Sequence, residues 1–155
     1  MIEILFSPRQ RILTFSFRGI VSFRSSNSCS SSKAHDRKGF DCGQADLNDF
    51  LIRHARQAHG SGASKSYVAI DSADNKTVLG IYTLSPAHID FEAVPGAARP
   101  VGGGRHAVGG FRLGRLAVST TCQGKGLGGE LLIAVARRCI RVSAQVGGTL
   151  LLIGA

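Results

Sequence analysis

Apolar residues recur at helical spacing in two separate parts of the chain. The first part runs from Asp41 to His59, and its spacing predicts a helix. Asp41 is a candidate cap for the start of this helix, and Gly60 and Gly62 are stop signals beyond its end. The residues that define its apolar face are Ala45, Leu47, Phe50, Leu51, His54 and Ala55.

The second helical pattern extends from Glu130 to Val146. Gly147 and Gly148 follow it, and glycine is the usual residue just beyond the C-terminus of a helix. One face of this helix should therefore pack on the core, with the residues Leu132, Val135, Ala136, Cys139, Val142 and Val146.

Short apolar runs predict strands around these helices. The runs 66–70 and 78–84 are separated by the polar stretch 71–76, which predicts an antiparallel hairpin. The run 111–118 leads into a glycine-rich turn. The run 149–153 is nearly all apolar, as expected for a strand deep in a sheet.

The first 34 residues differ in composition from the rest. Residues 11–18 could form a strand, and the serine-rich stretch 25–32 is typical of a linker. We therefore predict a poorly ordered N-terminal extension over residues 1–34 and a single domain over residues 35–155. The alternative is an ordinary first strand and loop.

A long loop is predicted over residues 93–110, which are rich in proline and glycine. It carries Arg99, Arg105 and His106, which are candidate contacts for a polyanionic substrate. The alternative is a solvated loop without a ligand. No Gly-Lys-Ser or Gly-Lys-Thr sequence is present in it, so it does not match a nucleotide-binding P-loop.

The chain has 155 residues, enough for one α/β domain, and a formal net charge of +9. A basic surface favours a polyanionic partner such as nucleic acid or a nucleotide cofactor, although it also fits a merely soluble basic protein. No apolar run reaches the roughly 18 residues that a membrane-spanning helix needs.

The four cysteines give no sign of a metal site. No two of Cys29, Cys42, Cys122 and Cys139 have CxxC spacing, so we expect neither a zinc site nor a redox pair. Unpaired cysteines of this kind fit a reducing compartment, and we expect a cytoplasmic protein without a metal cofactor.

The most informative stretch is Gln123-Gly124-Lys125-Gly126-Leu127-Gly128-Gly129, between a predicted strand and a predicted helix. Successive backbone N–H groups in such a loop can converge on a diphosphate at the positive end of the helix dipole. Glycines remove the Cβ atoms that would block a close approach, and Lys125 can add a positive charge.

Three interpretations of this loop compete. Its glycines satisfy the GxGxxG pattern of a dinucleotide-binding fold, but that fold needs an acidic residue about 20 positions later, and none follows Glu130. A glycine-rich turn without a ligand is the second interpretation. The third is a coenzyme A loop.

The third interpretation comes from a specific resemblance. Gln123 to Gly128 match the signature of the GNAT superfamily of N-acetyltransferases, which is Gln or Arg, two residues, Gly, one residue, then Gly or Ala. The resemblance implies that acetyl-coenzyme A is the co-substrate. It implies that strand residues pair with the pantetheine arm and that loop amides hold the pyrophosphate. The residues in these roles are Leu116, Ala117, Val118, Gln123, Gly124, Lys125, Gly126, Leu127, Gly128 and Gly129.

A narrower resemblance covers about residues 35–155. Phe40-Asp41-Cys42-Gly43, Gly80-Ile81-Tyr82-Thr83-Leu84 and Arg115-Leu116-Ala117-Val118 are similar to segments of the GNAT toxins of bacterial toxin–antitoxin pairs. That resemblance implies an aminoacyl-tRNA as acceptor, a ribbon-helix-helix antitoxin as partner, and a homodimer. The positive net charge agrees with an RNA substrate.

The resemblance also implies a fold of the α/β (α+β) class, a mixed and mostly antiparallel sheet flanked by helices. In GNAT enzymes a tyrosine on the helix after the strand that is here 150–153 acts as the acid. The chain ends at Ala155, so we expect the last helix and strands to be missing. The edge of strand 150–153 would then be free. Tyr82 is the remaining candidate for the acid, with packing in the sheet as its alternative.

The sequence thus predicts an acyltransferase that moves an acetyl group from acetyl-coenzyme A to a primary amine. The amino acid of an aminoacyl-tRNA is the toxin-like candidate for that amine. Because the expected tyrosine is absent, we predict weak or no turnover. The alternative is a truncated, non-catalytic GNAT-fold protein that binds coenzyme A, an antitoxin or RNA.

Overall fold

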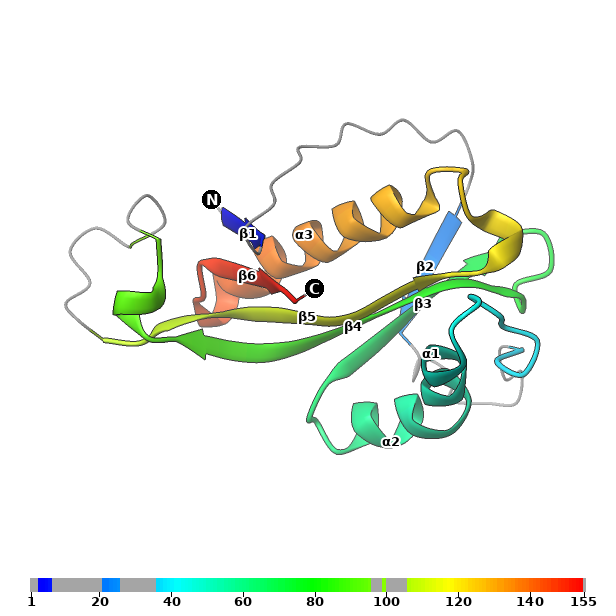
Figure 1. Cartoon of the computed structure of the whole chain (residues 1–155), viewed down its shortest axis with the longest axis horizontal. Helices are drawn as coiled ribbons and strands as arrows, with labels where there is room; N and C mark the ends of the chain where they lie inside the picture. Colours follow the sequence, from blue (N-terminus) through cyan, green and yellow to red (C-terminus); the bar gives the residue numbers. More distant parts are fainter. Residues whose placement is uncertain (1–2, 7–20, 26–35, 96–98, 100–105, 155) are drawn as a thin grey trace.

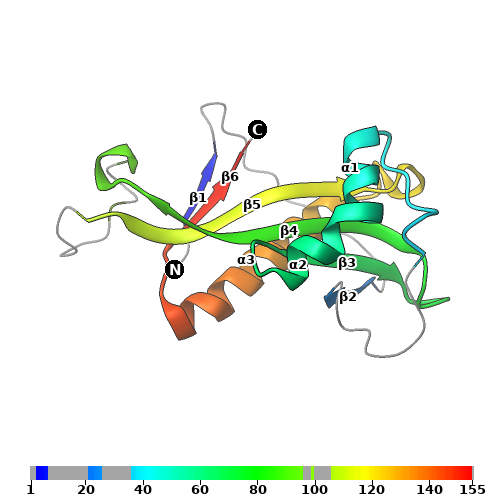
Figure 2. The same ribbon diagram turned by 90° about the horizontal axis from the view of Figure 1, so that it is seen from below.

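The protein is described by a computed structural model over residues 3–6, 21–25, 36–95, 99 and 106–154. A twisted sheet forms its centre, with helices on both faces (Figures 1 and 2). The elements in chain order are β1 (Glu3–Phe6), β2 (Val21–Ser25), α1 (Ala45–Asp49), the π-helical turn η1 (Phe50–His54), α2 (Ala55–Gly60), β3 (Lys65–Asp71), β4 (Val78–Ile89), the 3-10 turn η2 (Phe91–Ala93), β5 (Val108–Val118), the 3-10 turn η4 (Thr120–Cys122), α3 (Leu127–Val146) and β6 (Leu150–Ile153).

The described strands form one mixed sheet in the order β1-β6-β5-β4-β3-β2. β2, β3, β4 and β5 pair in antiparallel fashion, whereas β5, β6 and β1 are parallel. This arrangement agrees with the predicted mixed and mostly antiparallel sheet. It also excludes a doubly wound parallel sheet, so the dinucleotide-binding interpretation of the glycine loop is wrong.

The predicted hairpin is confirmed, but its second strand is longer than the sequence indicates. β3 and β4 pair in antiparallel register, with Tyr67 opposite Tyr82. β4 continues past the predicted end at Leu84 to Ile89 and includes Pro86, a residue that is uncommon within strands. Its extension pairs with the first residues of β5, from Val108 onward. Pairing with a long neighbouring strand has overridden the local breaker signal.

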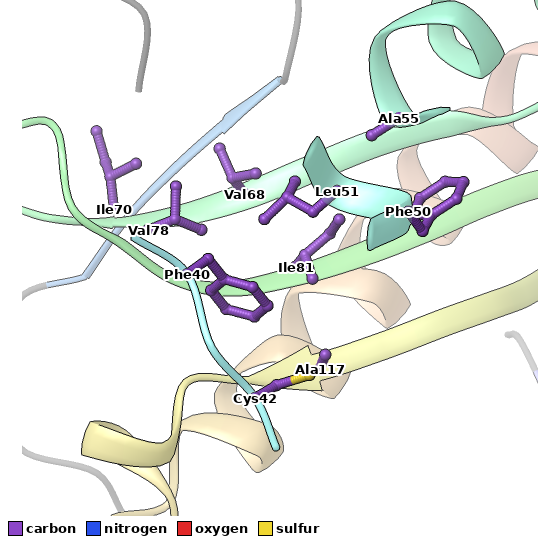
Figure 3. Packing of buried hydrophobic residues seen from close by; sticks show 10 residues of the cluster. All are labelled: Phe40, Cys42, Phe50, Leu51, Ala55, Val68, Ile70, Val78, Ile81 and Ala117. Carbon is purple, nitrogen blue, oxygen red and sulfur yellow. The ribbon is translucent and has the colours of Figure 1, made fainter. Parts of the chain in front are cut away.

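Each face of the sheet is covered by an apolar cluster. α3 packs on one face over Tyr82, Leu84 and Leu113. The helical segment from α1 to α2 packs on the other face, where Leu51 and Ala55 are fully buried. Figure 3 shows this second cluster, which consists of Phe40, Cys42, Phe50, Leu51, Ala55, Val68, Ile70, Val78, Ile81 and Ala117.

The first helix begins four residues later than predicted, at Ala45. Asp41 does not cap it. The Asp41 carboxylate instead accepts hydrogen bonds from the N–H of Gly43 at 2.9 Å and from the side-chain amide of Asn48 at 2.8 Å. Gly43 has φ +79°, so the chain turns sharply here before the helix can start.

α3 begins at Leu127, three residues before the predicted start, and ends at Val146 as predicted. Gly147, at φ +81°, donates its N–H to Ser143 and ends the helix. The buried face only partly agrees with the prediction. Val135 and Cys139 are buried as predicted, but Leu132, Ala136 and Val142 are only half-buried and Val146 is 75% exposed. The fully buried positions are Leu127, Leu131, Val135 and Cys139.

β1 and β2 come from the first 34 residues and lie at the two edges of the sheet. β1 pairs with β6, so the edge of residues 150–153 that we expected to be free is paired. The domain boundary near residue 35 stays a prediction. The predicted strand 11–18 and the stretch 26–32 of the linker lie outside the described residues.

Within the predicted loop 93–110, β5 already begins at Val108. Arg99 stacks over the ring of Phe91 and donates to the backbone oxygens of Val94 and Glu92. Arg99, a candidate for a substrate contact, therefore stabilises the conformation of its own loop. His106 is exposed, and Arg105 lies outside the described residues.

The burial of α3 gives a test of the fold. Leu131, on the buried face of α3, is 0% exposed, whereas Ile133 on the same helix is 37% exposed. We expect Leu131→Ala to lower the free energy of unfolding by about 2–5 kcal/mol. Ile133→Ala should cost less than about 1 kcal/mol. Urea unfolding followed by circular dichroism measures both, and equal losses would contradict the packing of α3.

Candidate functional site: the glycine loop between β5 and α3

The glycine loop connects the end of β5 to the start of α3 through the short turn η4 (Figure 1). Gly124 and Gly126 adopt φ +73° and φ +86°, a left-handed conformation that side chains disfavour. Gly126 occupies the cap position of α3. The two glycines therefore allow the chain to reverse within a few residues and to present the first turn of the helix.

The first turn of α3 leaves backbone N–H groups available. The N–H groups of Gly129 and Glu130 both bond to the carbonyl of Gly126, at 3.0 and 3.3 Å. For Gly126, Leu127 and Gly128, no acceptor is found among the described residues. Free N–H groups at the positive end of a helix dipole form a site for an anion such as a phosphate.

The side chain of Gln123 braces this loop. Its Nε2 donates to the carbonyl of Val118, at the end of β5, and to the carbonyl of Cys42, both at 3.0 Å. A second tie is the N–H of Thr120, which donates to the carbonyl of Asp41 at 2.8 Å. The loop is thus fastened both to its own strand and to the segment that precedes α1.

The segment 40–43 is itself ordered by a small polar network. The side-chain oxygen of Asn48 accepts from the N–H of Cys42 at 3.0 Å, and its amide donates to Asp41. The hydrogen bonds from Gly43 and Asn48 lower the pKa of the Asp41 carboxyl below its usual value. Figure 3 shows Cys42 beside Ala117 of β5 in the apolar cluster.

Sequence reasoning missed the hydrogen bond between the Gln123 side chain and the Cys42 carbonyl. Gln123 was assigned to the cofactor loop from its motif, and residues 40–43 were singled out only by resemblance. The two are 81 positions apart in the chain. No local pattern pairs them, because a backbone carbonyl carries no residue-specific signal.

Lys125 lies on the rim of the loop. Its ammonium donates to the carbonyl of Thr121 at 2.7 Å, and its side chain is exposed. The positive charge therefore stays within the turn. Its contribution to cofactor binding remains a prediction.

At the end of β5, one edge of the backbone is not paired with another described strand. β6 pairs with residues 110–113, and β4 pairs with the other edge of β5 as far as Val118. No described strand pairs with residues 114–118 on the β6 side. Leu116 and Val118 pack toward α3, and Ala117 packs toward α1. The backbone groups of these three residues can pair with an extended ligand.

Tyr82 lies on the face of the sheet that α3 covers, and it is 0% exposed. Its hydroxyl accepts a hydrogen bond from Nε of Arg138 at 3.1 Å, and its ring stacks on Tyr67 with centroids 5.0 Å apart. Burial raises the pKa of the Tyr82 hydroxyl, and Arg138 partly opposes that shift. These surroundings favour the packing role over that of a catalytic acid.

No group of three or more His, Cys, Asp or Glu side chains able to hold a metal ion occurs in the described part of the chain. Among the helices that the structure describes, none is long and apolar enough to cross a membrane.

Similar proteins were found both by sequence and by structure, although no protein-family model matches the chain. A tRNA-acetylating toxin of Mycobacterium tuberculosis is 31% identical over 123 residues, which are 75% of this chain and 67% of that protein. A probable toxin TacT of Sinorhizobium fredii is 24% identical over 113 residues, which are 73% of this chain and 62% of that protein. The chain thus spans about two thirds of the length of these curated relatives.

The solved structures give the same result. The toxin AtaT complexed with acetyl-methionyl-tRNAfMet superposes with a TM-score of 0.75 at 25% identity, covering 88% of this chain and 78% of AtaT. A mutant of AtaT bound to the C-terminus of the antitoxin AtaR and to acetyl-CoA gives a TM-score of 0.71 at 25% identity, covering 87% of this chain and 75% of the mutant.

The chain belongs to the family of GNAT-fold tRNA-acetylating toxins. For a GNAT-fold chain, the strand–loop–helix unit from β5 to α3 is the segment in which the superfamily signature lies. Membership favours the coenzyme A interpretation of the loop over a glycine turn without a ligand. The roles of residues 116–118 and 123–129 remain predictions.

The brace formed by Gln123 can be tested directly. In Gln123→Glu a carboxylate would replace the amide donor and would face the carbonyls of Cys42 and Val118. We expect this change to weaken acetyl-CoA binding by roughly tenfold. It removes two hydrogen bonds and leaves a carboxylate facing two carbonyl oxygens, which costs about 1–3 kcal/mol. Isothermal titration calorimetry measures the affinity.

Gln123→Arg serves as the matched control. Arginine carries only N–H donors and is the other residue that the signature allows at this position. It should bind acetyl-CoA within about threefold of the unmodified chain, a difference of under 1 kcal/mol. Equal affinities for the Glu and Arg variants would show that the donor function of Gln123 is unimportant.

Proposed function

We propose that the chain is an N-acetyltransferase that moves the acetyl group of acetyl-CoA to the amino group of an aminoacyl-tRNA in the cytoplasm. The observation that carries the proposal is the set of free N–H groups at Gly126, Leu127 and Gly128, held by the Gln123 brace. Membership in the toxin family supports the choice of acceptor.

Acetyl-CoA would lie across the glycine loop and the end of β5. Its diphosphate fits the anion site at the start of α3, because N–H donors and the helix dipole both favour negative charge there. The pantetheine arm would follow the backbone of Leu116, Ala117 and Val118. AtaT has been crystallised with acetyl-CoA, and the same co-substrate is proposed for this chain.

Acyl transfer requires a neutral amine next to the thioester carbon. The amine nitrogen forms a bond to the carbonyl carbon, the carbon–sulfur bond breaks, the sulfur leaves as a thiolate, and the amine loses a proton. A backbone N–H near Leu116 or Ala117 would stabilise the negative charge that develops on the carbonyl oxygen. The buried hydroxyl of Tyr82 is poorly placed to protonate the thiolate.

The acceptor is proposed on two grounds. The net charge of +9 suits an RNA ligand, because Lys and Arg neutralise its phosphates. The AtaT structure that superposes on this chain contains an acetylated aminoacyl-tRNA. By the same reasoning we propose a ribbon-helix-helix antitoxin as partner and a homodimer as assembly, since AtaT has also been solved with the C-terminus of its antitoxin.

A second candidate function is a non-catalytic protein that binds coenzyme A, an antitoxin or RNA. The burial of Tyr82 favours it, because that tyrosine was the remaining candidate for the acid. A thioester-consumption assay with charged tRNA separates the two. Release of coenzyme A thiol that depends on the charged tRNA supports the enzyme, and binding without release supports the alternative.

The cofactor site can be tested at Gly128. This residue lies in the first turn of α3, and a Cβ added there would meet only Val118 Cγ2, at 3.8 Å. Gly128→Asp adds a carboxylate among the free N–H groups. We expect acetyl-CoA affinity to fall about 100-fold or more, because like charges near 4 Å repel by about 4 kcal/mol. Calorimetric titration measures it.

Gly128→Ala is the control, since it adds the Cβ without the charge and should bind nearly as well as the unmodified chain. The Asp variant should not unfold, because an acidic residue in the first turn of a helix is favourable. Position 126 is less suitable, as its φ of +86° would strain any side chain. Equal binding by both Gly128 variants would refute the proposed diphosphate site.

A further inference from the structure

Arg115 is an exposed arginine on β5, next to the residues proposed to hold the pantetheine arm. Its guanidinium carbon lies 3.9 Å from the centre of the Phe50 ring, which belongs to η1. Phe50 is only 8% exposed and is fixed within the apolar cluster between the sheet and the α1–α2 segment (Figure 3).

A bulge in β5 directs Arg115 to this face. Side chains alternate between the two faces of a regular strand, so Leu113 and Leu116 should lie on opposite faces. Both nevertheless pack in the cluster beneath α3. The register shifts at this point, where Thr83 pairs with Arg115 but Leu84 pairs with Leu113. The extra residue is Gly114, and it places Arg115 on the same face as Ala117.

The contact with Phe50 fixes the position of the Arg115 guanidinium but does not neutralise its charge. No carboxylate in the described part of the chain forms an ion pair with it, whereas nearby Arg53 pairs with Asp49 at 2.7 Å. Stacking on Phe50 covers one face of the planar guanidinium and leaves its N–H groups at the edge. Such a group suits a phosphate, which two parallel N–H donors can bind together.

The position of Arg115 relates it to the acceptor. The free N–H groups of the glycine loop belong to α3, which covers one face of the sheet (Figure 1). A thioester held along residues 116–118 is approached from the α3 side by the coenzyme A itself. The opposite face of the sheet is then left for the amine, and Arg115 lies on that face beside Leu116.

We propose that Arg115 binds a backbone phosphate near the 3′ end of the acceptor RNA and so places the aminoacyl group beside the end of β5. The proposal rests on the function proposed above. It names a positioning residue that recognises the RNA strand, independently of the identity of the amino acid. A small amine without a phosphate would gain nothing from this contact.

The test measures binding of an acceptor-stem RNA hairpin that carries an amino acid at its 3′ end through a stable amide. Fluorescence anisotropy gives its affinity over a range of salt concentrations, for the full chain saturated with coenzyme A. Loss of one phosphate contact should reduce the slope of log affinity against log salt concentration by about 1. We expect this for Arg115→Gln, with affinity roughly tenfold lower at low salt.

Two variants control for charge and for general attraction. Arg115→Lys retains the charge and should keep most of the slope, because an ammonium still neutralises one phosphate. Arg141→Gln removes an exposed arginine from α3, on the opposite face, and should leave the slope unchanged. A structural defect in β5 would lower the affinity for acetyl-CoA, which Arg115→Gln should preserve.

The outcomes separate this inference from the function on which it rests. If the unmodified chain fails to bind acetyl-CoA, the proposed function is refuted. If it binds both acetyl-CoA and the hairpin but Arg115→Gln keeps the full slope, only the role of Arg115 is refuted. Equal losses from Arg115→Gln and Arg141→Gln would also refute it. Should the Gln variant unfold, Arg115→Met replaces it, since its stem still covers Phe50.

Discussion

Two hydrogen bonds from the Gln123 side chain hold three segments of the chain in one place. They join the end of β5 at Val118, the glycine loop, and the turn before α1 at Cys42. A loop with two left-handed glycines would otherwise be free to adopt many conformations, each with its N–H groups in a different direction. Because of this brace, the loop can bind an anion without a large further loss of conformational entropy.

In the proposed function, this region places the two substrates on opposite faces of the sheet. The N–H groups that favour an anion lie at the start of α3, on one face of the sheet, and Arg115 lies on the other. Between them, residues 115–118 of β5 pair with β4 on one edge, and no described strand pairs with their other edge. The bulge at Gly114 produces this arrangement, because it changes the direction of the side chains just before the proposed transfer position.

The sequence was most informative where structure is local. The hairpin of β3 and β4, the end of α3 at Gly147 and the order of strand, glycine loop and helix all follow from residues close in the chain. The GNAT superfamily could be inferred because its signature is contiguous from Gln123 to Gly128.

The features that sequence reasoning missed depend either on competing local hydrogen bonds or on residues that are distant in the chain. Ala45 starts the first helix because Asp41 bonds to Gly43 and Asn48, a choice between two local networks that propensity does not decide. β4 extends to Ile89 because β5 lies beside it. The contact of Gln123 with Cys42 joins carbonyl and amide groups that leave no pattern in the sequence.

The central claim is that the N–H groups at the start of α3 bind the diphosphate of coenzyme A. Amide proton and nitrogen chemical shifts, recorded during separate titrations with coenzyme A and with pantetheine, test it most directly. We expect coenzyme A to produce its largest shifts at Gly126, Leu127 and Gly128, and pantetheine, which lacks the diphosphate, to leave these three signals in place. Shifts of equal size with both ligands, or none at these residues with coenzyme A, would contradict it.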